Sequence, residues 1–131
     1  MTISKFRVWD KKWSEWEKDV FVGFDGRLYQ KSKNTVYGVA VSAITRDDII
    51  LMQSTGLFDM YDKEIFEGDV LQTSDSELAK VVWNKELACW EAEFLSEIVD
   101  LSEVADVKSN RSDCEIVGNI YENPELVEEV K

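Results

Sequence analysis

Short stretches of alternating apolar and polar residues, separated by turn-forming residues about every ten positions, run along most of the chain. Near the start, Phe6 and Val8 alternate with Arg7 and Trp9, which is the two-residue period of a half-buried strand. Many short strands with frequent turns predict a mainly β or α+β protein with few short helices.

Two segments carry clear hairpin signals. Asp25-Gly26 joins the apolar residues 19–24 to residues 27–30, and an Asp-Gly pair favours the tight turn of a β-hairpin. Residues 80–83 and 88–95 flank a second turn at 84–86, and in the later strand apolar residues alternate with cysteine and glutamate. Both segments are therefore predicted to be hairpins.

Other segments leave alternatives open. Residues 36–42 are apolar on both faces, which indicates a buried strand or a strand that bends at Gly38. Residues 96–107 have apolar residues at helical spacing and fit either a short amphipathic helix or two strand fragments. Asn123 and Pro124 suit the N-cap and first position of a helix, which predicts a short acidic helix at the end.

The length of 131 residues predicts a single domain, 1–131, with two parts. Residues 1–48 are expected to form an amino-terminal hairpin layer. Residues 49–131 contain Gly68-Asp69-Val70, the strand that it opens, the second hairpin and a final strand at 115–120. This order resembles a small SH3-like barrel, a likeness that predicts a barrel in the carboxyl-terminal half and carries no function with it.

Composition narrows the chemistry. The chain has no histidine, which excludes Ser-His and Cys-His catalytic pairs and the usual zinc-binding sets. Cys89 and Cys114 are expected to be reduced, partly buried thiols, because no apolar run is long enough to cross a membrane and no secretory signal is evident. The sequence therefore predicts a soluble cytoplasmic protein.

Charge is unevenly distributed along the chain. The net charge is −12, yet residues 1–34 hold eight basic and five acidic residues, a net +3, which leaves −15 on residues 35–131. Such an acidic body disfavours general binding to nucleic acid, because phosphate neutralisation supplies most of that affinity. It suits a well-solvated surface or a partner protein with a basic face.

Residues 59–69 hold the densest group of carboxylates. A metal-dependent enzyme needs several carboxylates that converge on one ion, and sequence adjacency alone does not bring them together. An EF-hand loop fails here because Tyr61 and Lys63 occupy ligand positions. We therefore predict no catalytic residue, no metal site and no cofactor, and expect Asp59 and Asp62 to form turn hydrogen bonds and Glu67 and Asp69 to flank a glycine turn.

Trp9, Trp13 and Trp16 have the spacing of a helix face, although the flanking strand pattern favours a β-hairpin. With the nearby lysines and arginines they could stack bases and contact phosphates of single-stranded nucleic acid. The same residues suit a hairpin core or a protein interface, and we favour that reading. Trp83 and Trp90 are expected in the core.

Residues 50–71 resemble the signature of the YopX family of phage and prophage proteins, in which the matching residues include Gly56, Leu57, Asp59, Glu64, Glu67, Gly68 and Asp69. Residues 5–10 and 117–126 resemble the start and the closing motif of that family. Residues 54–56 and 59–63 are interpreted as turns. The family's usual Asn-Gly is Tyr61-Asp62 here, so we expect a different or longer turn, since bulky Tyr61 disfavours positive φ.

The resemblance carries no activity, and the signature residues are expected to be structural. We expect a non-enzymatic protein-interaction module in a bacterial host cell, with itself or a host or phage protein as partner. One alternative is an acidic nucleic-acid mimic that binds a host DNA-binding protein. Another is a weak single-stranded nucleic-acid binder that uses the amino-terminal tryptophans.

Overall fold

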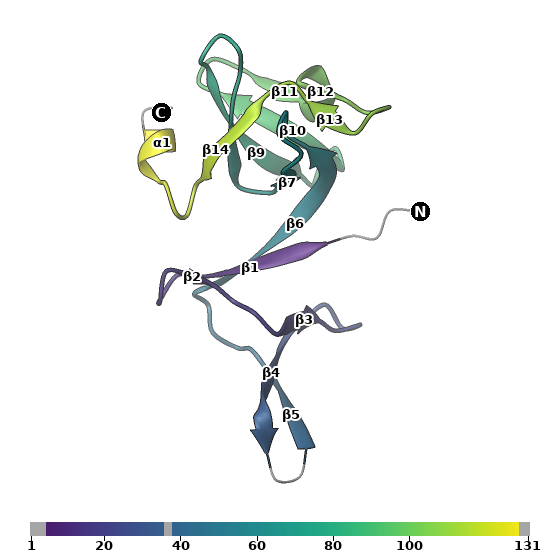
Figure 1. The fold of residues 1–131 in the computed structure, drawn as a ribbon, viewed down its shortest axis with the longest axis vertical. Helices are drawn as coiled ribbons and strands as arrows, with labels where there is room; N and C mark the ends of the chain where they lie inside the picture. Colours follow the sequence, from purple (N-terminus) through teal and green to yellow (C-terminus); the bar gives the residue numbers. More distant parts are fainter. Residues whose placement is uncertain (1–4, 36–37, 129–131) are drawn as a thin grey trace. The chain divides into compact units, whose positions relative to one another are not determined.

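The protein is described by a computed structural model that covers residues 5–35 and 38–128 (Figure 1). These residues form short strands in several small sheets, one 3₁₀ turn and one α-helix. The predicted mainly β fold with few short helices is confirmed. The chain divides into two compact units, residues 7–51 and residues 1–6 with 52–131, called here the amino-terminal and carboxyl-terminal units.

The amino-terminal unit begins with a hairpin of tryptophans. Strand β1 (Phe6–Asp10) pairs antiparallel with β2 (Glu15–Trp16), and Trp9 lies opposite Trp16. The hairpin predicted for the three tryptophans is therefore confirmed. The helix-like spacing of the tryptophans has another cause. Residues 11–14 form the four-residue turn between β1 and β2, so Trp9 and Trp16, seven positions apart in the sequence, lie opposite each other on paired strands.

The same unit contains a three-stranded antiparallel sheet in the order β3 (Val20–Val22), β4 (Leu28–Thr35) and β5 (Gly38–Ala43). The predicted hairpin at Asp25-Gly26 joins β3 to β4, and Gly26 has a φ of 79°. The Asp25 carboxylate accepts a hydrogen bond from the backbone N–H of Arg27 at 3.0 Å. Turn chemistry read from the sequence is thus confirmed at this hairpin.

The prediction of a buried strand at 36–42 is wrong for its described residues, and residues 36 and 37 lie outside them. Residues 40–43 of β5 are exposed, and the Val41 side chain is 53% exposed. Among residues 5–35 and 38–128, strand β5 pairs only with β4, and no second strand of that part of the chain lies along its outer edge. Apolar residues on both faces indicated burial, but they belong to an edge strand.

The carboxyl-terminal unit is built on a five-stranded antiparallel sheet. Its strands, in spatial order, are β11 (Ile98–Asp100), β10 (Cys89–Phe94), β9 (Leu78–Asn84), β8 (Asp69–Gln72) and β14 (Glu115–Asn119). The hairpin predicted around 84–86 joins β9 to β10, and the strands predicted near 70–73 and 115–120 are also confirmed. The helix predicted after Asn123 is α1 (Glu125–Glu128).

The predicted SH3-like barrel does not close among the described residues, because β11 and β14 stand at the two ends of this sheet and do not pair with each other. The chain between them forms a 3₁₀ turn (Leu101–Glu103), β12 (Ala105–Asp106) and β13 (Arg111–Ser112). Strand β13 pairs with β6 (Ile49–Phe58) instead of returning to the sheet. For residues 96–107 the sequence allowed a short amphipathic helix or two strand fragments. The structure has two strand fragments, β11 and β12, on either side of the 3₁₀ turn.

Residues 54–56, interpreted as a turn, lie inside β6. Gly56 has a φ of 79° and marks a bulge, because the pairing of β6 with β7 (Glu64–Phe66) shifts register between Ser54 and Phe58. The Ser54 hydroxyl accepts a hydrogen bond from the Gly56 N–H at 3.0 Å. The turn-forming residues bend a strand here and do not end it.

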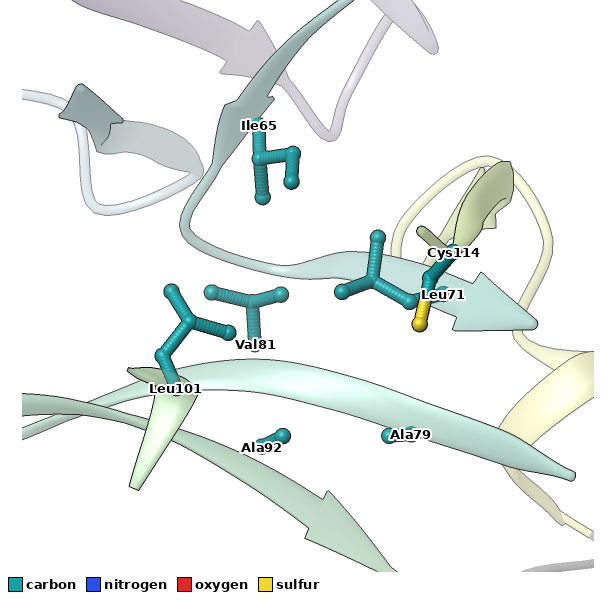
Figure 2. Close-up of a cluster of buried hydrophobic side chains, with 7 residues drawn as sticks. All are labelled: Ile65, Leu71, Ala79, Val81, Ala92, Leu101 and Cys114. Atoms are coloured by element: carbon teal, nitrogen blue, oxygen red, sulfur yellow. The ribbon is translucent and has the colours of Figure 1, made fainter. Parts of the chain in front are cut away.

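The hydrophobic core of this unit lies on one face of the sheet. Strands β8, β9 and β10 each contribute to it, and the 3₁₀ turn and the chain before β14 close over them (Figure 2). The fully buried members are Ile65, Leu71, Ala79, Val81, Ala92, Leu101 and Cys114. Trp90 packs against this core, as predicted, but Trp83 is 42% exposed and contacts Trp90 edge-on, so its predicted core position is wrong.

Candidate functional site

The signature region contains a buried carboxylate, Asp59, with no exposed surface. Its Oδ1 accepts hydrogen bonds from the backbone N–H groups of Tyr61 at 2.9 Å and Lys63 at 2.8 Å. Its Oδ2 accepts one from the N–H of Ile116 at 3.0 Å, which links the signature to β14. All these contacts are to backbone, so this carboxylate shapes the fold.

The turn after Asp59 is the longer one expected from the sequence. The Asp59 carbonyl accepts a hydrogen bond from the Asp62 N–H at 3.1 Å, and the Asp59 N–H donates to the Lys63 carbonyl at 2.8 Å. Asp62 takes the positive φ, 66°, and Tyr61 does not. This is the three-residue loop with a left-handed last residue that hairpins use when no Asn-Gly is present.

The other signature residues are also held in the scaffold. Asp69 is buried and accepts a hydrogen bond from the Phe66 N–H at 2.8 Å, while Gly68 precedes it with a φ of 86°. Glu64 accepts hydrogen bonds from Ser54 and from Lys5. Leu57 packs against the core, Gly56 forms the bulge, and the Glu67 N–H donates to the Gln53 carbonyl at 2.9 Å.

The carboxylates of residues 59–69 do not form a cation site. Within the described ranges, 5–35 and 38–128, no three acidic or cysteine side chains are grouped as a metal ion would need. Cys89 and Cys114 are free thiols. The signature residues thus position backbone segments of the carboxyl-terminal unit.

The three amino-terminal tryptophans have different environments. Trp9 is buried and contacts Trp16 edge-on with ring centroids 4.9 Å apart. The Arg7 guanidinium lies over the Trp16 ring at 4.7 Å, a cation–π contact. Trp13 lies in the turn, is 63% exposed, and has the Lys12 ammonium 5.2 Å from its ring centroid. Of these predicted interface residues, Trp13 is the one that presents most of its ring at the surface.

A buried carboxylate that sequence reasoning missed holds this hairpin turn. Asp10 Oδ1 accepts hydrogen bonds from the N–H groups of Lys12 at 2.9 Å and Trp13 at 3.2 Å, and from Arg46 at 2.9 Å. Asp10 is fully buried. The spacing of Asp10 to Lys12 and Trp13 was a readable turn signal, but the contact with Arg46, 36 residues away, was not.

Asp10 and Glu17 form a carboxyl pair. Burial raises the pKa of Asp10, but hydrogen bonds from Glu17, the Trp13 N–H, Arg46 and the Lys12 N–H together hold that pKa below its ordinary value. The hydrogen bond to Asp10, burial and the charge of Asp10 raise the pKa of Glu17. Glu17 therefore loses its proton at a higher pH than an isolated glutamate does, because Asp10 beside it is already charged.

One face of the three-stranded sheet is exposed and apolar. Phe21 stacks on Tyr29 with ring centroids 5.7 Å apart, Tyr29 lies opposite Ala43, and Val41 follows two residues earlier on β5. Because residues paired across strands share a face, these four lie on one face, where the exposed Lys31 lies opposite Val41. Phe21 is 45% exposed, and Val41 and Ala43 are also exposed. These four residues are called the exposed apolar face below. The sequence did not predict this face, because residues 36–42 were expected to form a buried strand.

The two units differ sharply in charge. Residues 7–51 hold eight basic and seven acidic residues, a net +1, and the remaining residues hold seven basic and 20 acidic residues, a net −13. The two values return the −12 of the whole chain. The amino-terminal unit is therefore nearly neutral, and the acidic character lies in the carboxyl-terminal unit.

Comparison with known proteins places the whole chain in one group. A family model described as YopX protein matches residues 5–128. The chain is similar to the crystal structure of protein EF1440 from Enterococcus faecalis, with 25% identity and a TM-score of 0.64, over 97% of this chain and 99% of that one. It is also similar to the crystal structure of protein yopX from Bacillus subtilis, with 16% identity and a TM-score of 0.61, over 92% and 95%.

A comparison with curated proteins found no match. In the part of the chain that the structure describes, no helix has the length and apolar character needed to span a membrane.

Proposed function

This chain belongs to the YopX protein family, and we propose that it is a non-enzymatic interaction module that associates with itself through its amino-terminal unit. The observation that carries the proposal is the exposure of Trp13, Phe21 and Val41 on a nearly neutral unit. Exposed apolar and aromatic side chains grouped on one small unit are typical of protein interfaces.

Charge supports the choice of the amino-terminal unit. An interface between two copies of the carboxyl-terminal unit would bring together surfaces with a net charge of −13 each, and that repulsion opposes association. An interface between two amino-terminal units, each with a net charge of +1, meets little such opposition. Self-association is therefore favoured where apolar exposure is combined with low net charge.

The non-enzymatic part rests on how the acidic residues are used. Asp59 and Asp69 accept hydrogen bonds from backbone N–H groups and are buried, so neither is available for proton transfer to a substrate. The chain has no histidine that could act as a general base. These features support a binding role.

Two exposed apolar residues make a matched test. Phe21 is 45% exposed in the amino-terminal unit and Met60 is 47% exposed in the carboxyl-terminal unit. We expect size-exclusion chromatography with light scattering to give a discrete oligomer for the natural chain. Phe21→Ala should shift it toward the mass of one chain, and Met60→Ala should not. A monomeric natural chain, or equal effects of the two substitutions, would contradict the proposal.

The charge of the carboxyl-terminal unit supports a second candidate function. A net charge of −13 on one compact unit suits the basic surface of a DNA-binding protein, as a nucleic-acid mimic does. Salt-sensitive binding to a basic host protein, retained by Phe21→Ala, would favour this function. Single-stranded nucleic-acid binding has less support, because Trp9 is buried and Trp16 already lies under Arg7.

A further inference from the structure

Strand β5 is an edge strand whose outward backbone groups follow from its register with β4. Ile44 donates a hydrogen bond from its N–H to the Leu28 carbonyl at 2.9 Å, and Gln30 lies opposite Ser42. In an antiparallel pair, hydrogen-bonded and non-hydrogen-bonded residue pairs alternate. Ser42 therefore bonds inward to β4, while the N–H and C=O groups of Val41 and Ala43 point away from it.

The outer edge of β5 lacks the features that normally block pairing. Edge strands are commonly protected by lysine, proline or a bulge on the edge itself. Residues 38–43, GVAVSA, contain no charge and no proline. The register irregularity between Lys31 and Asn34 lies on the inner strand β4, so residues 41–43 stay in regular register.

The other sheet edges are less suited to pairing. On β14, the Ile116 N–H donates to Asp59, and the carbonyl of the preceding Cys114 accepts from the Met60 N–H, so the signature hairpin occupies that edge. Strand β11 contains Asp100 within its three residues. Strand β3 is also only three residues long. Strand β5 is the longest uncharged edge in the described part of the chain.

We propose that β5 pairs antiparallel with β5 of a second copy of this chain, with Val41 of each copy opposite Ala43 of the other. The outward groups lie two residues apart, so a two-fold axis beside Ser42 brings each N–H to a carbonyl of the other copy. The two pairs together form four backbone hydrogen bonds and join two three-stranded sheets into one of six strands.

The two-fold axis also decides which side chains meet. Val41 and Ala43 of both copies lie on the same side of the joined sheet, so the exposed apolar face becomes continuous across the axis. Ser42 of each copy lies opposite Ser42 of the other, in a non-hydrogen-bonded pair where side chains approach closely. No charged side chain of residues 38–43 opposes another, which suits a second copy as the occupant.

The pairing rests on the proposed self-association, and its first test removes an outward donor. Val41→Pro eliminates one outward N–H per chain, two of the four interface bonds, and should weaken association about tenfold or more. The matched control is Ile98→Pro: Ile98 is the outward residue of edge strand β11 by the same register argument and is 58% exposed, against 53% for Val41. Circular dichroism checks that both variants remain folded.

The second test addresses the register through residue 42. Ser42→Lys and Ser42→Glu each place like charges across the axis and should each weaken association about fivefold. An equal mixture of the two variants should associate again as a heterodimer. Ser42→Gln is the neutral control.

The outcomes separate the two proposals. Light scattering that shows a monomeric natural chain overturns self-association and this pairing together. An oligomer that tolerates Val41→Pro as well as Ile98→Pro, or whose charge variants do not recover on mixing, overturns this pairing and leaves self-association in place.

Discussion

Asp59 and Ile116 lie 57 residues apart in the sequence, yet Asp59 Oδ2 accepts a hydrogen bond from the Ile116 N–H at 3.0 Å. The other oxygen of the same carboxylate closes the turn of the signature hairpin through Tyr61 and Lys63. One buried side chain thus forms a local turn and attaches it to the last strand of the sheet.

We expect Asp59→Ala to lower the free energy of unfolding by about 3 kcal/mol, because three partly buried N–H groups lose their shared acceptor. Asp59→Asn should also be damaging, since its amide nitrogen would face an N–H group. Urea unfolding followed by fluorescence measures both. The control is Asp62→Asn, which keeps a residue tolerant of positive φ and removes an exposed ion pair with Arg111; its effect should stay below about 1 kcal/mol. Equal losses at 59 and 62 would contradict this role of Asp59.

Gly56 and Gly118 are required for different reasons. Gly56 has a φ of 79° with nothing within 4 Å of an added Cβ, whereas a Cβ on Gly118 would lie 2.9 Å from Leu126 Cδ1 and against the Asn123 side chain. Gly56→Ala should cost about 1–2 kcal/mol, and Gly56→Asn less, because asparagine tolerates this φ. Gly118→Ala should cost about 1–3 kcal/mol from overpacking, and Gly118→Asn more. Urea unfolding of the four variants measures these losses of stability. Alanine should cost more than asparagine at position 56 and less than asparagine at position 118, and the same order at both positions would contradict the two different roles.

Local turn chemistry explains which parts of the fold the sequence predicted. The hairpins at Asp25-Gly26 and at 84–86, and the pairing of Trp9 with Trp16, depend on residues close in sequence. Family resemblance added the signature and its departure at Tyr61-Asp62. The expected longer turn followed from the steric cost of positive φ at tyrosine, a property of one residue.

Long-range pairing explains what the sequence did not predict. Gly56 has the same conformational signal in a turn and in a strand bulge, and only the pairing of β6 with β7 distinguishes them. The contact of Asp10 with Arg46 joins segments 36 residues apart. Burial of β5 and closure of a barrel both depend on which strand lies beside an edge, and the alternation of side chains along one strand does not contain that information.

The two free thiols should react at different rates. Burial raises the pKa of Cys89, as do the charges of Glu91 and Asp100 and a hydrogen bond to Asp100, and burial also raises the pKa of Cys114. Cys114 lies in the hydrophobic core (Figure 2). Cys89 is half-buried on β10. A thiol reagent at pH 8 should therefore modify Cys89 first, with both slower than in the unfolded chain. Cys89→Ser and Cys114→Ser assign the two phases, and a fast phase that persists in Cys89→Ser would contradict the assignment.

The carboxyl pair of Asp10 and Glu17 makes the stability of the amino-terminal unit depend on pH. The pKa of Glu17 is raised above its ordinary value of 4.5, chiefly by the hydrogen bond to Asp10. A group with a raised pKa contributes stability that is fully present below its unfolded pKa and is lost as pH rises through its folded pKa. Above that folded pKa, Glu17 and Asp10 are both charged and repel each other, with Arg46 offsetting part of the repulsion.

Glu17→Gln removes this charge and leaves an amide that can donate to Asp10. The variant should be more stable than the natural chain at pH 7, and the difference should shrink as pH falls through the raised folded-state pKa of Glu17 and be smallest once pH lies below 4.5. Thermal unfolding between pH 4 and 8 measures the difference, and Glu15→Gln, the same charge change two residues earlier, is the control. A Glu17→Gln difference that does not vary with pH, or that Glu15→Gln reproduces in full, would show that general charge reduction and not a shared proton is responsible. The pair would then act only to close the hairpin turn, because the backbone N–H groups of Lys12 and Trp13 bond to Asp10 whether or not Glu17 is protonated.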